Sequence, residues 1–256
     1  MKRLAAIFTG FLLLAGPAFA TITTTQIAGV SEVSANTTYT VPITSAVSAG
    51  QGVIVVVYAL TNSEATPTVT DSASSCTYTL HSNTNSPSPA GSMMIFSCPN
   101  STGLTTSNTF TVSYATSSKA AIVAFATSGM ATSSPYDKAG TAATVSTAST
   151  ALLFTSASPA MAVANELVLA ASVVLVDASG LSISSPGGGF SSVATVGPAG
   201  SNQPALYVYG QNLASGTATM SGTWSAAVTS GGNYYLFKPA ASAVVFHNLM
   251  TLGVGE

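Results

Sequence analysis

Charged side chains are almost absent from this sequence. Only 5% of the 256 residues are charged, whereas an average soluble domain has about 25%. The five Lys and Arg residues form no basic cluster and the seven Asp and Glu residues form no acidic tail. These two absences exclude the usual signatures of nucleic-acid binding. We therefore predict no nucleic-acid partner.

Motifs that bind metals or cofactors are missing as well. The chain has no C-x-x-C, H-x-H or D-x-D-x-D spacing, and its only histidines are His81 and His247. We expect no metal and no cofactor. What the sequence does contain is 38 Ser, 35 Thr and 47% hydrophobic residues. This composition is too apolar for a disordered chain.

The first twenty residues have the pattern of a secretory signal peptide. Lys2 and Arg3 precede an apolar stretch at residues 4–15, and residues 18–20 form the small-x-small pattern of a cleavage site. We expect cleavage after Ala20. The mature product is therefore expected to be secreted, extracellular or held at the cell surface.

The rest of the chain shows the pattern of strands. Some segments alternate polar and apolar residues, and others are short apolar runs typical of strands buried on both faces. Turn residues separate them, no window has a long helical period, and every apolar run is shorter than the roughly 20 residues of a membrane-spanning helix. We expect an all-β fold without a transmembrane segment in the mature chain. The expected strands include residues 53–60, 109–114, 121–126, 167–176, 204–211, 217–224 and 233–238.

The two cysteines, Cys76 and Cys98, are expected to form a structural disulfide. Between them residues 81–91 are rich in Ser, Pro and Asn, which predicts a hairpin loop. Such a hairpin pairs residue 76 with 98, 78 with 96 and 80 with 94, so that the thiols and the apolar residues share one face. A redox-active pair is the alternative, but the C-x-x-C spacing is missing.

The order of the expected strands occurs twice, which suggests an internal repeat. The pseudo-repeats cover about residues 50–130 and 165–240, and equivalent segments start at 53 and 167, 94 and 206, and 109 and 217. The link between them contains a further apolar segment, residues 152–154, where we expect an extra strand. We predict one antiparallel β-sandwich over residues 21–240, jelly-roll-like and built from the two pseudo-repeats, with two tandem domains as the alternative.

A short motif adds a family resemblance. Val69-Thr70-Asp71-Ser72 is followed by Thr77-Tyr78-Thr79, and this order resembles a loose group of exported bacterial β-sandwich proteins. The resemblance covers about residues 50–238, although Ser75-Cys76 stands where those proteins commonly carry Gly-Asn. It implies a surface or extracellular role and names no ligand.

Catalytic groups are sparse, and we predict that the protein is not an enzyme. His81 lies in the Ser/Pro-rich stretch and His247 near the C-terminus, so a Ser-His-Asp triad would have to join distant segments. A secreted glycoside hydrolase would need two facing carboxylates. The candidates are Glu32, Glu64, Asp71, Asp137, Glu166 and Asp177.

Aromatic residues provide the weak candidates for ligand binding. Trp224 shares its strand face with Ala218 and Met220, which predicts a core tryptophan. Tyr207 and Tyr209 lie on one face of their strand, and the aliphatic residues of the strand lie on the opposite face. The two tyrosines are therefore the better candidates for exposed rings. They are the residues that a carbohydrate-binding module would use.

The C-terminal tail, residues 241–256, lies beyond both pseudo-repeats and is unusually apolar. We expect residues 244–252 to pair with a sheet edge of the same molecule, and donation to a neighbouring subunit is the alternative.

The predicted function is that of an exported structural or surface-interaction protein, active in adhesion or assembly. Its expected partners are copies of itself or surface glycans. A carbohydrate-binding module is the first alternative and a secreted hydrolase the second.

Overall fold

All regular structure in the described part of the chain is β-strand, which confirms the all-β prediction. No helix occurs among the described residues. The predicted signal peptide up to residue 18 and the tail from residue 242 onwards lie outside the described residues, so both stay predictions. The computed structural model describes residues 19–32, 34–61, 67–87, 89–152, 154, 157–176, 181–184, 186–197 and 203–241.

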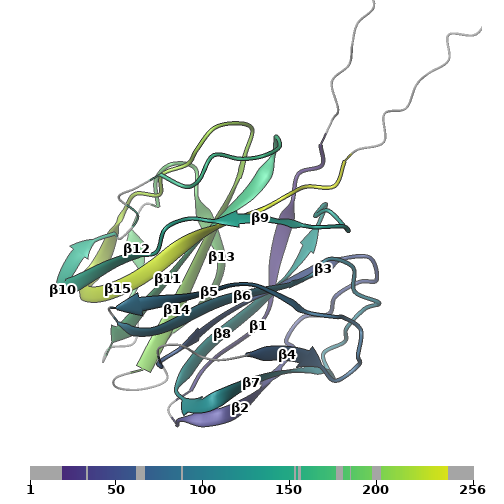
Figure 1. Cartoon of the computed structure of the whole chain (residues 1–256), viewed down its shortest axis with the longest axis horizontal. Coiled ribbons are helices and arrows are strands. Elements are labelled where there is room, and N and C mark those ends of the chain that lie inside the picture. Colours follow the sequence, from purple (N-terminus) through teal and green to yellow (C-terminus); the bar gives the residue numbers. More distant parts are fainter. Residues whose placement is uncertain are drawn as a thin grey trace, which may run out of the picture.

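Three antiparallel sheets are stacked as layers (Figure 1). The middle layer is a five-stranded sheet. In sheet order its strands are β1 (Thr23–Ser31), β8 (Ala120–Ser128), β3 (Gly52–Ala59), β6 (Ala90–Cys98) and β5 (Thr79–Pro87). One outer layer is a three-stranded sheet. Its strands are β2 (Asn36–Pro42), β7 (Thr109–Ser118) and β4 (Thr68–Asp71).

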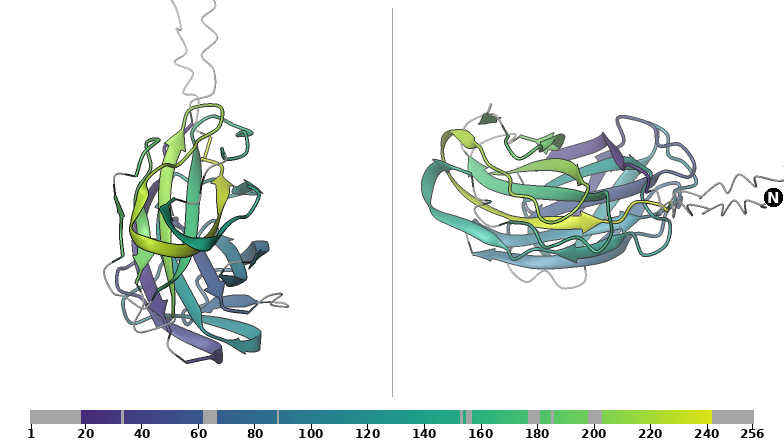
Figure 2. Two further views of the ribbon diagram at one scale, coloured as in Figure 1. Left: turned by 90° about the vertical axis from the view of Figure 1, so that its left-hand side faces the viewer. Right: turned by 90° about the horizontal axis from the view of Figure 1, so that it is seen from above.

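The other outer layer is a seven-stranded sheet. Its main strands, in sheet order, are β10 (Ala143–Ala151), β15 (Thr223–Phe237), β11 (Glu166–Val176), β14 (Gln203–Leu213) and β13 (Ser191–Val196). Two short strands, β9 (Tyr136–Ala139) and β12 (Ile183–Ser184), also pair with β15. Figure 2 shows that the long strands of the stacked layers run in roughly the same direction.

Strand β3 explains why the middle sheet needs a layer on each side. All eight of its residues are buried. Val53, Val55 and Val57 pack toward the three-stranded sheet, whereas Ile54 and Val56 pack toward the seven-stranded sheet. Alternate residues of a strand point to opposite faces, so an uninterrupted apolar run is stable only between two layers.

The outer face of the seven-stranded sheet is covered by chain segments instead of a further sheet. Leu152, Phe154 and Phe190 reach this face from connecting segments and pack with Trp224 of β15. Trp224 is 2% exposed, which confirms the predicted core tryptophan. The expected strand at residues 152–154 is wrong, because β10 ends at Ala151 and the apolar residues after it serve as cover.

The alternating segment at residues 217–224 is only partly a strand. Residues 217–222 belong to no ladder, and β15 begins at Thr223. The predicted faces are nevertheless correct, since Ala218 and Met220 are buried and Thr217 and Thr219 are exposed. Alternation of polar and apolar residues indicates which side chains are buried. It can occur in a segment that pairs with no neighbouring strand.

The predicted loop between the cysteines is wrong. Strand β5 continues to Pro87, and a tight connection leads into β6 at Ala90. Leu80 lies opposite Phe96 instead of residue 94, and a register shift follows between Leu80 and Ser82. Proline and a bulge are tolerated here because β5 is the outer strand of its sheet.

The strand orders of the two large sheets correspond position by position. The order β1-β8-β3-β6-β5 matches β10-β15-β11-β14-β13 when β3 is aligned with β11. The predicted repeat aligns the same two segments, which start at residues 53 and 167. One hydrophobic cluster also draws residues from both halves, including Ile54, Phe125, Leu169 and Val208. Nothing else tests the internal repeat, and it stays a prediction.

The disulfide between Cys76 and Cys98 is present, with Cα atoms 5.7 Å apart. Cys98 ends β6, whereas Cys76 lies in the connection before β5 and not in a strand. The bond therefore fastens the segment that joins two sheets, and does not link two neighbouring strands.

Replacing both cysteines by alanine is expected to lower the free energy of unfolding by about 3 kcal/mol, since the bond restricts a loop of this length in the unfolded chain. Urea denaturation of the variant and of the oxidised protein measures the difference. The reduced wild-type protein is the control and should behave like the variant. Equal stability of oxidised and reduced protein would contradict the prediction.

Candidate functional site

Tyr207 and Tyr209, the predicted exposed rings, are buried. Their exposed fractions are 5% and 6%. The hydroxyl of Tyr207 donates a hydrogen bond of 2.9 Å to the carbonyl of Leu181, and its ring meets Trp224 edge-on with centroids 5.1 Å apart. Burial raises the pKa of Tyr207 to about 12. The predicted exposure is wrong because connecting segments cover this face of β14.

Asp71 organises the turn after β4. Its carboxylate accepts hydrogen bonds from the backbone N–H groups of Ala73, Ser75 and Cys76, at 2.9 to 3.1 Å, and from the hydroxyl of Ser75 at 3.1 Å. The residue is 6% exposed. A carboxylate whose oxygens are all used in this way positions the backbone beside the disulfide and has no acceptor free for catalysis.

Glu166 has a related role at the start of β11. Its Oε1 accepts hydrogen bonds from the N–H groups of Ala162 and Val163, at 3.1 and 3.0 Å. Its Oε2 is buried without a hydrogen-bond partner. Burial raises the pKa of Glu166, and the nearby charge of Asp137 adds to the effect. Asp137 itself forms an ion pair with Lys138 at 3.2 Å.

His81 joins the middle sheet to the seven-stranded sheet. Its Nε2 lies 2.7 Å from the hydroxyl oxygen of Ser97 on β6. The ring stacks on Tyr136 of β9 with centroids 4.6 Å apart and approaches Phe237 of β15 edge-on. Ser97 is 1% exposed, so this Ser–His pair is closed to a substrate. We interpret it as a packing contact between sheets.

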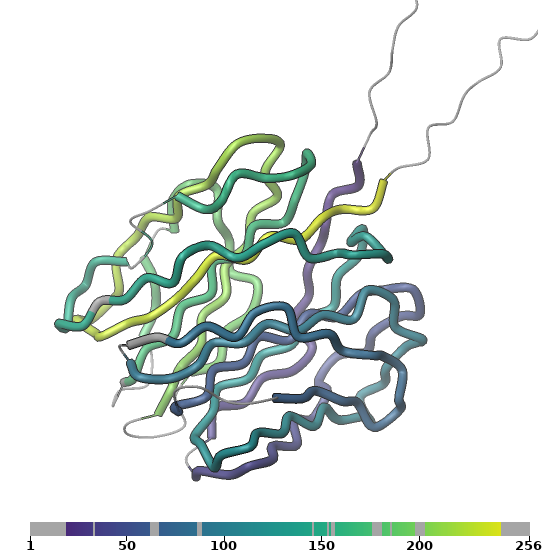
Figure 3. The backbone as a smooth tube through the Cα atoms, in the orientation of Figure 1, coloured from purple at the N-terminus to yellow at the C-terminus, as the bar shows by residue number. Residues whose placement is uncertain are grey.

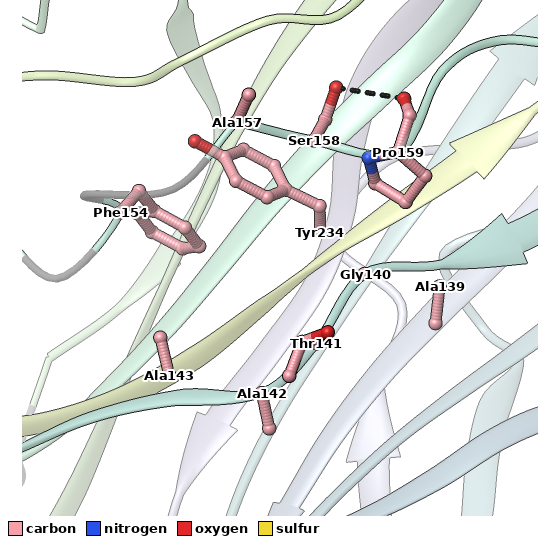
Figure 4. Close-up of a pocket in the computed structure, with 10 residues that line it drawn as sticks. All are labelled: Ala139, Gly140, Thr141, Ala142, Ala143, Phe154, Ala157, Ser158, Pro159 and Tyr234. Carbon is pink, nitrogen blue, oxygen red and sulfur yellow. Dashed lines mark hydrogen bonds between the residues drawn. The ribbon is translucent and has the colours of Figure 1, made fainter.

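A cavity with a volume of about 520 Å³ lies on the seven-stranded side. Figure 4 shows residues 139–143, from the end of β9 to the start of β10, along it, together with the adjacent rings of Phe154 and Tyr234. Ser158 bonds to the carbonyl of Pro159 at its border. None of the lining residues is charged. The cavity could accept only a neutral ligand without burying an unpaired charge.

The outer face of the three-stranded sheet carries two rows of hydroxyl side chains. Register places Thr38, Ser113 and Thr68 in one row and Thr40, Thr111 and Thr70 in the next. Residues within a row are about 4.8 Å apart and the rows about 6.8 Å apart, from the spacing of strands and of alternate residues. Those on β2 and β4 are exposed, and the two on β7 are half-buried. We call these six residues the hydroxyl face.

Sequence reasoning did not single out the hydroxyl face. The signal was present as T-x-T in the segments that became β2 and β4, and as T-x-S in the segment that became β7. Each occurrence alone is ordinary for a strand with one face in water. Only the pairing of β7 with β2 and β4 brings the three together.

The remaining predicted groups do not form a site in the described residues. Glu32 is half-buried just after β1, and Glu64, Asp177 and His247 lie outside the described residues. In the part of the chain that the structure covers, no three His, Cys, Asp or Glu side chains are grouped as metal ligands. Within the same ranges, no helix has the length and hydropathy needed to span a membrane.

Comparison with known proteins adds no assignment. The chain matches no protein-family model, no curated protein and no solved structure.

Asp71→Asn and Glu166→Gln are expected to act in opposite directions on stability. The first change would turn an amide N–H₂ toward backbone donors and should lower the free energy of unfolding by about 2 kcal/mol, the size of a bond to a charged group. The second change keeps the acceptor and removes a buried charge, so stability at neutral pH should be equal or higher. Urea denaturation tests both. A loss of equal size in both variants would show that Glu166 is needed as a carboxylate.

The stability of the protein is expected to fall in mild acid because of His81. Burial lowers the pKa of His81, so below the unfolded value of about 6.5 the unfolded chain binds the proton more readily than the folded chain. Stability therefore declines as pH falls from about 6.5 and levels off below the folded pKa. The raised pKa of Glu166 acts in the opposite sense.

A variant isolates the contribution of His81. His81→Phe retains a ring against Tyr136 but cannot be protonated, and Ser97→Ala in both proteins removes the effect of the lost hydrogen bond. Melting temperatures between pH 8 and pH 4 are the measurement. We expect the acid-induced decline to be smaller in the His81→Phe, Ser97→Ala protein than in Ser97→Ala alone. Parallel profiles would rule out His81 as the cause.

Proposed function

We propose that the protein is an exported structural or surface-interaction protein that adheres to uncharged hydroxylated surfaces or to copies of itself. The observation that carries this proposal is the hydroxyl face. It is a two-row array of uncharged donors and acceptors on neighbouring strands, and its members on β2 and β4 are exposed to solvent.

The distribution of charge supports the proposal. Of the seven charged residues in the described part of the chain, Asp71 and Glu166 are buried and Asp137 pairs with Lys138. A surface with so little charge offers weak electrostatic repulsion against a neutral surface or another copy. The predicted signal peptide and the disulfide are both in keeping with an extracellular location.

The positions of the acidic residues argue for binding without catalysis. Asp71 is occupied by backbone donors, and Glu166 is buried at the start of β11. The Ser97–His81 pair is closed to solvent on the serine side. A hydrolase would need such groups beside an open cavity.

A carbohydrate-binding module is the second candidate. The observation that favours it is the neutral cavity beside Phe154 and Tyr234, because sugars are bound by uncharged polar groups next to aromatic rings. Its binding would depend on Tyr234 and not on the hydroxyl face, which separates the two candidates.

Adhesion of the mature chain to microcrystalline cellulose and to a hydroxyl-terminated monolayer tests the proposal. We expect binding to be nearly the same at about 0.01 M and about 1 M salt, although the Debye length falls from about 30 Å to about 3 Å. Thr40→Lys, Thr70→Lys and Thr111→Lys together place three cations on one row and should weaken binding about tenfold or more. Quartz-crystal microbalance measurements give the affinities.

A control with the same added charge shows whether location matters. Thr147, Thr150 and Ser192 are exposed hydroxyl residues of β10 and β13, away from the hydroxyl face. Their joint replacement by lysine should leave adhesion nearly unchanged. Equal loss in both triple variants would contradict the proposed face. Loss only in Tyr234→Ala would favour the carbohydrate-binding cavity instead.

A further inference from the structure

The outer strands of the three sheets differ in how well they are protected against pairing with another strand. Register shifts interrupt the pairing of β1, β5, β10, β13 and β2. Such bulges twist an edge and prevent a regular ladder on its free side. Strand β4 pairs with β7 over Thr68–Asp71 without a shift, and within the described residues its other side has no strand partner. Among these outer strands, β4 is the regular edge.

Side chains cover other edges in addition. The amide of Gln26 on β1 bonds to both backbone groups of Thr195 on β13, at 3.1 and 3.0 Å. This amide takes the place of a neighbouring backbone. On the opposite side of the molecule, His81 of β5 stacks on Tyr136 of β9. These contacts cover parts of β1, β13 and β5, the strands that also carry register shifts.

A groove lined by apolar and threonine side chains adjoins the edge of β4. It has a volume of about 360 Å³ and is lined from β4 by Val69 and its neighbours, and from the other side by Tyr78, Leu80 and Phe96. Leu80 is 36% exposed and is the exposed large hydrophobic side chain of the described residues. A free backbone edge beside apolar pockets is the arrangement to which an extended peptide adds as a strand.

The groove is held in shape before any segment binds. The Cys76–Cys98 disulfide lies in its wall. The Asp71 carboxylate fixes the backbone of Ser75 and Cys76 at its end. A preformed groove saves the ordering cost that a mobile one would add to binding.

The C-terminal tail is the segment with the right chemistry and starting point. Its 15 residues after Ala241 contain eight Val, Leu, Met, Phe or Ala residues, no proline and one charge, at Glu256. Ala241 bridges to Phe19, and Ala20 donates to the carbonyl of Ala240. Figure 3 shows the described chain ends side by side. Cleavage after Ala20 would remove Phe19 and Ala20, so that Ala240 and Ala241 would lose these partners.

The tail also starts at the end of the middle sheet that lies level with Cys98. Ala240 donates to the carbonyl of Gly129, just after β8. Register across β8, β3 and β6 places this end of β8 level with Cys98. The turn held by Asp71 is tied to Cys98 through the disulfide. A tail that starts here meets the Asp71 end of β4 first and would run antiparallel to the strand.

The reach is sufficient within one molecule. From β8 to β5 are three strand spacings of about 4.8 Å, and β4 lies in the layer about 10 Å away. Crossing both takes about seven extended residues at roughly 3.3 Å each. About eight residues of the tail then remain for β4, which has four. A short tether also raises the effective concentration of the tail to the millimolar range, which favours its own groove over that of another copy.

We propose that, in the mature protein, the last apolar part of the tail, residues 249–254, adds to β4 of the same molecule as an antiparallel strand and places apolar side chains in the groove beside Leu80. This pairing covers the regular edge of the sheet and leaves the hydroxyl face open. It does not depend on the adhesive function proposed above.

Hydrogen exchange in the mature protein with and without residues 242–256 tests the proposal. Removal of the tail should increase exchange of the β4 amides that do not bond to β7. Strand β2, the other outer strand of this sheet, is the internal control, and its protection should not change if the sheet stays folded. Unchanged exchange in β4 would overturn the proposal.

Cross-linking separates pairing within a molecule from donation between molecules. The side chain of Thr70 is exposed on β4, so Thr70→Cys can be combined with single cysteines at residues 249 to 252. We expect disulfides within monomers for one or two of these positions, since Cα atoms must approach to about 4.4–6.8 Å. Thr147→Cys on β10 with the same tail cysteines is the control and should not cross-link. Covalent dimers through Thr70→Cys would overturn pairing within one molecule, and equal yields from both sites would overturn the assignment to β4.

Discussion

The burial of the middle sheet on both faces is the constraint on which the rest of the structure depends. Strand β3 has no exposed residue, and nearly all of β6 and β8 is buried with it. One face is covered by β2, β4 and β7, and the other by strands from the second half of the chain. Neither half by itself can therefore bury the apolar surface that it carries. This mutual burial holds the layers together in a molecule with very few charges.

Scarcity of charge changes how the sheet edges are closed. Natural sheets often place lysine or glutamate at an edge to prevent association. Here bulges interrupt the long outer strands, and neutral groups such as the Gln26 amide and the His81 ring bond or stack across the layers. The exterior of the described chain consequently carries little charge and many hydroxyl groups. This is the property that suits contact with a neutral surface.

The few acidic groups serve the fold at its junctions. Asp71 ties the end of β4 to the segment that carries Cys76, and Glu166 holds the turn before β11. Their environments are not alike, because Asp71 uses both oxygens whereas one oxygen of Glu166 is unpartnered. Low charge overall thus coexists with carboxylates placed where backbone donors need an acceptor.

The sequence by itself determined the all-β class, the buried strands, the core position of Trp224 and the pairing of the two cysteines. These follow from local alternation, from composition and from the presence of only two thiols. Only the tertiary structure decided what covers each face. It buried Tyr207 and Tyr209 under connecting segments, extended β5 through the expected loop, and aligned Thr and Ser residues of β2, β7 and β4 on one face. Local patterns report whether a side chain is covered, whereas the identity of its neighbour depends on contacts between distant segments.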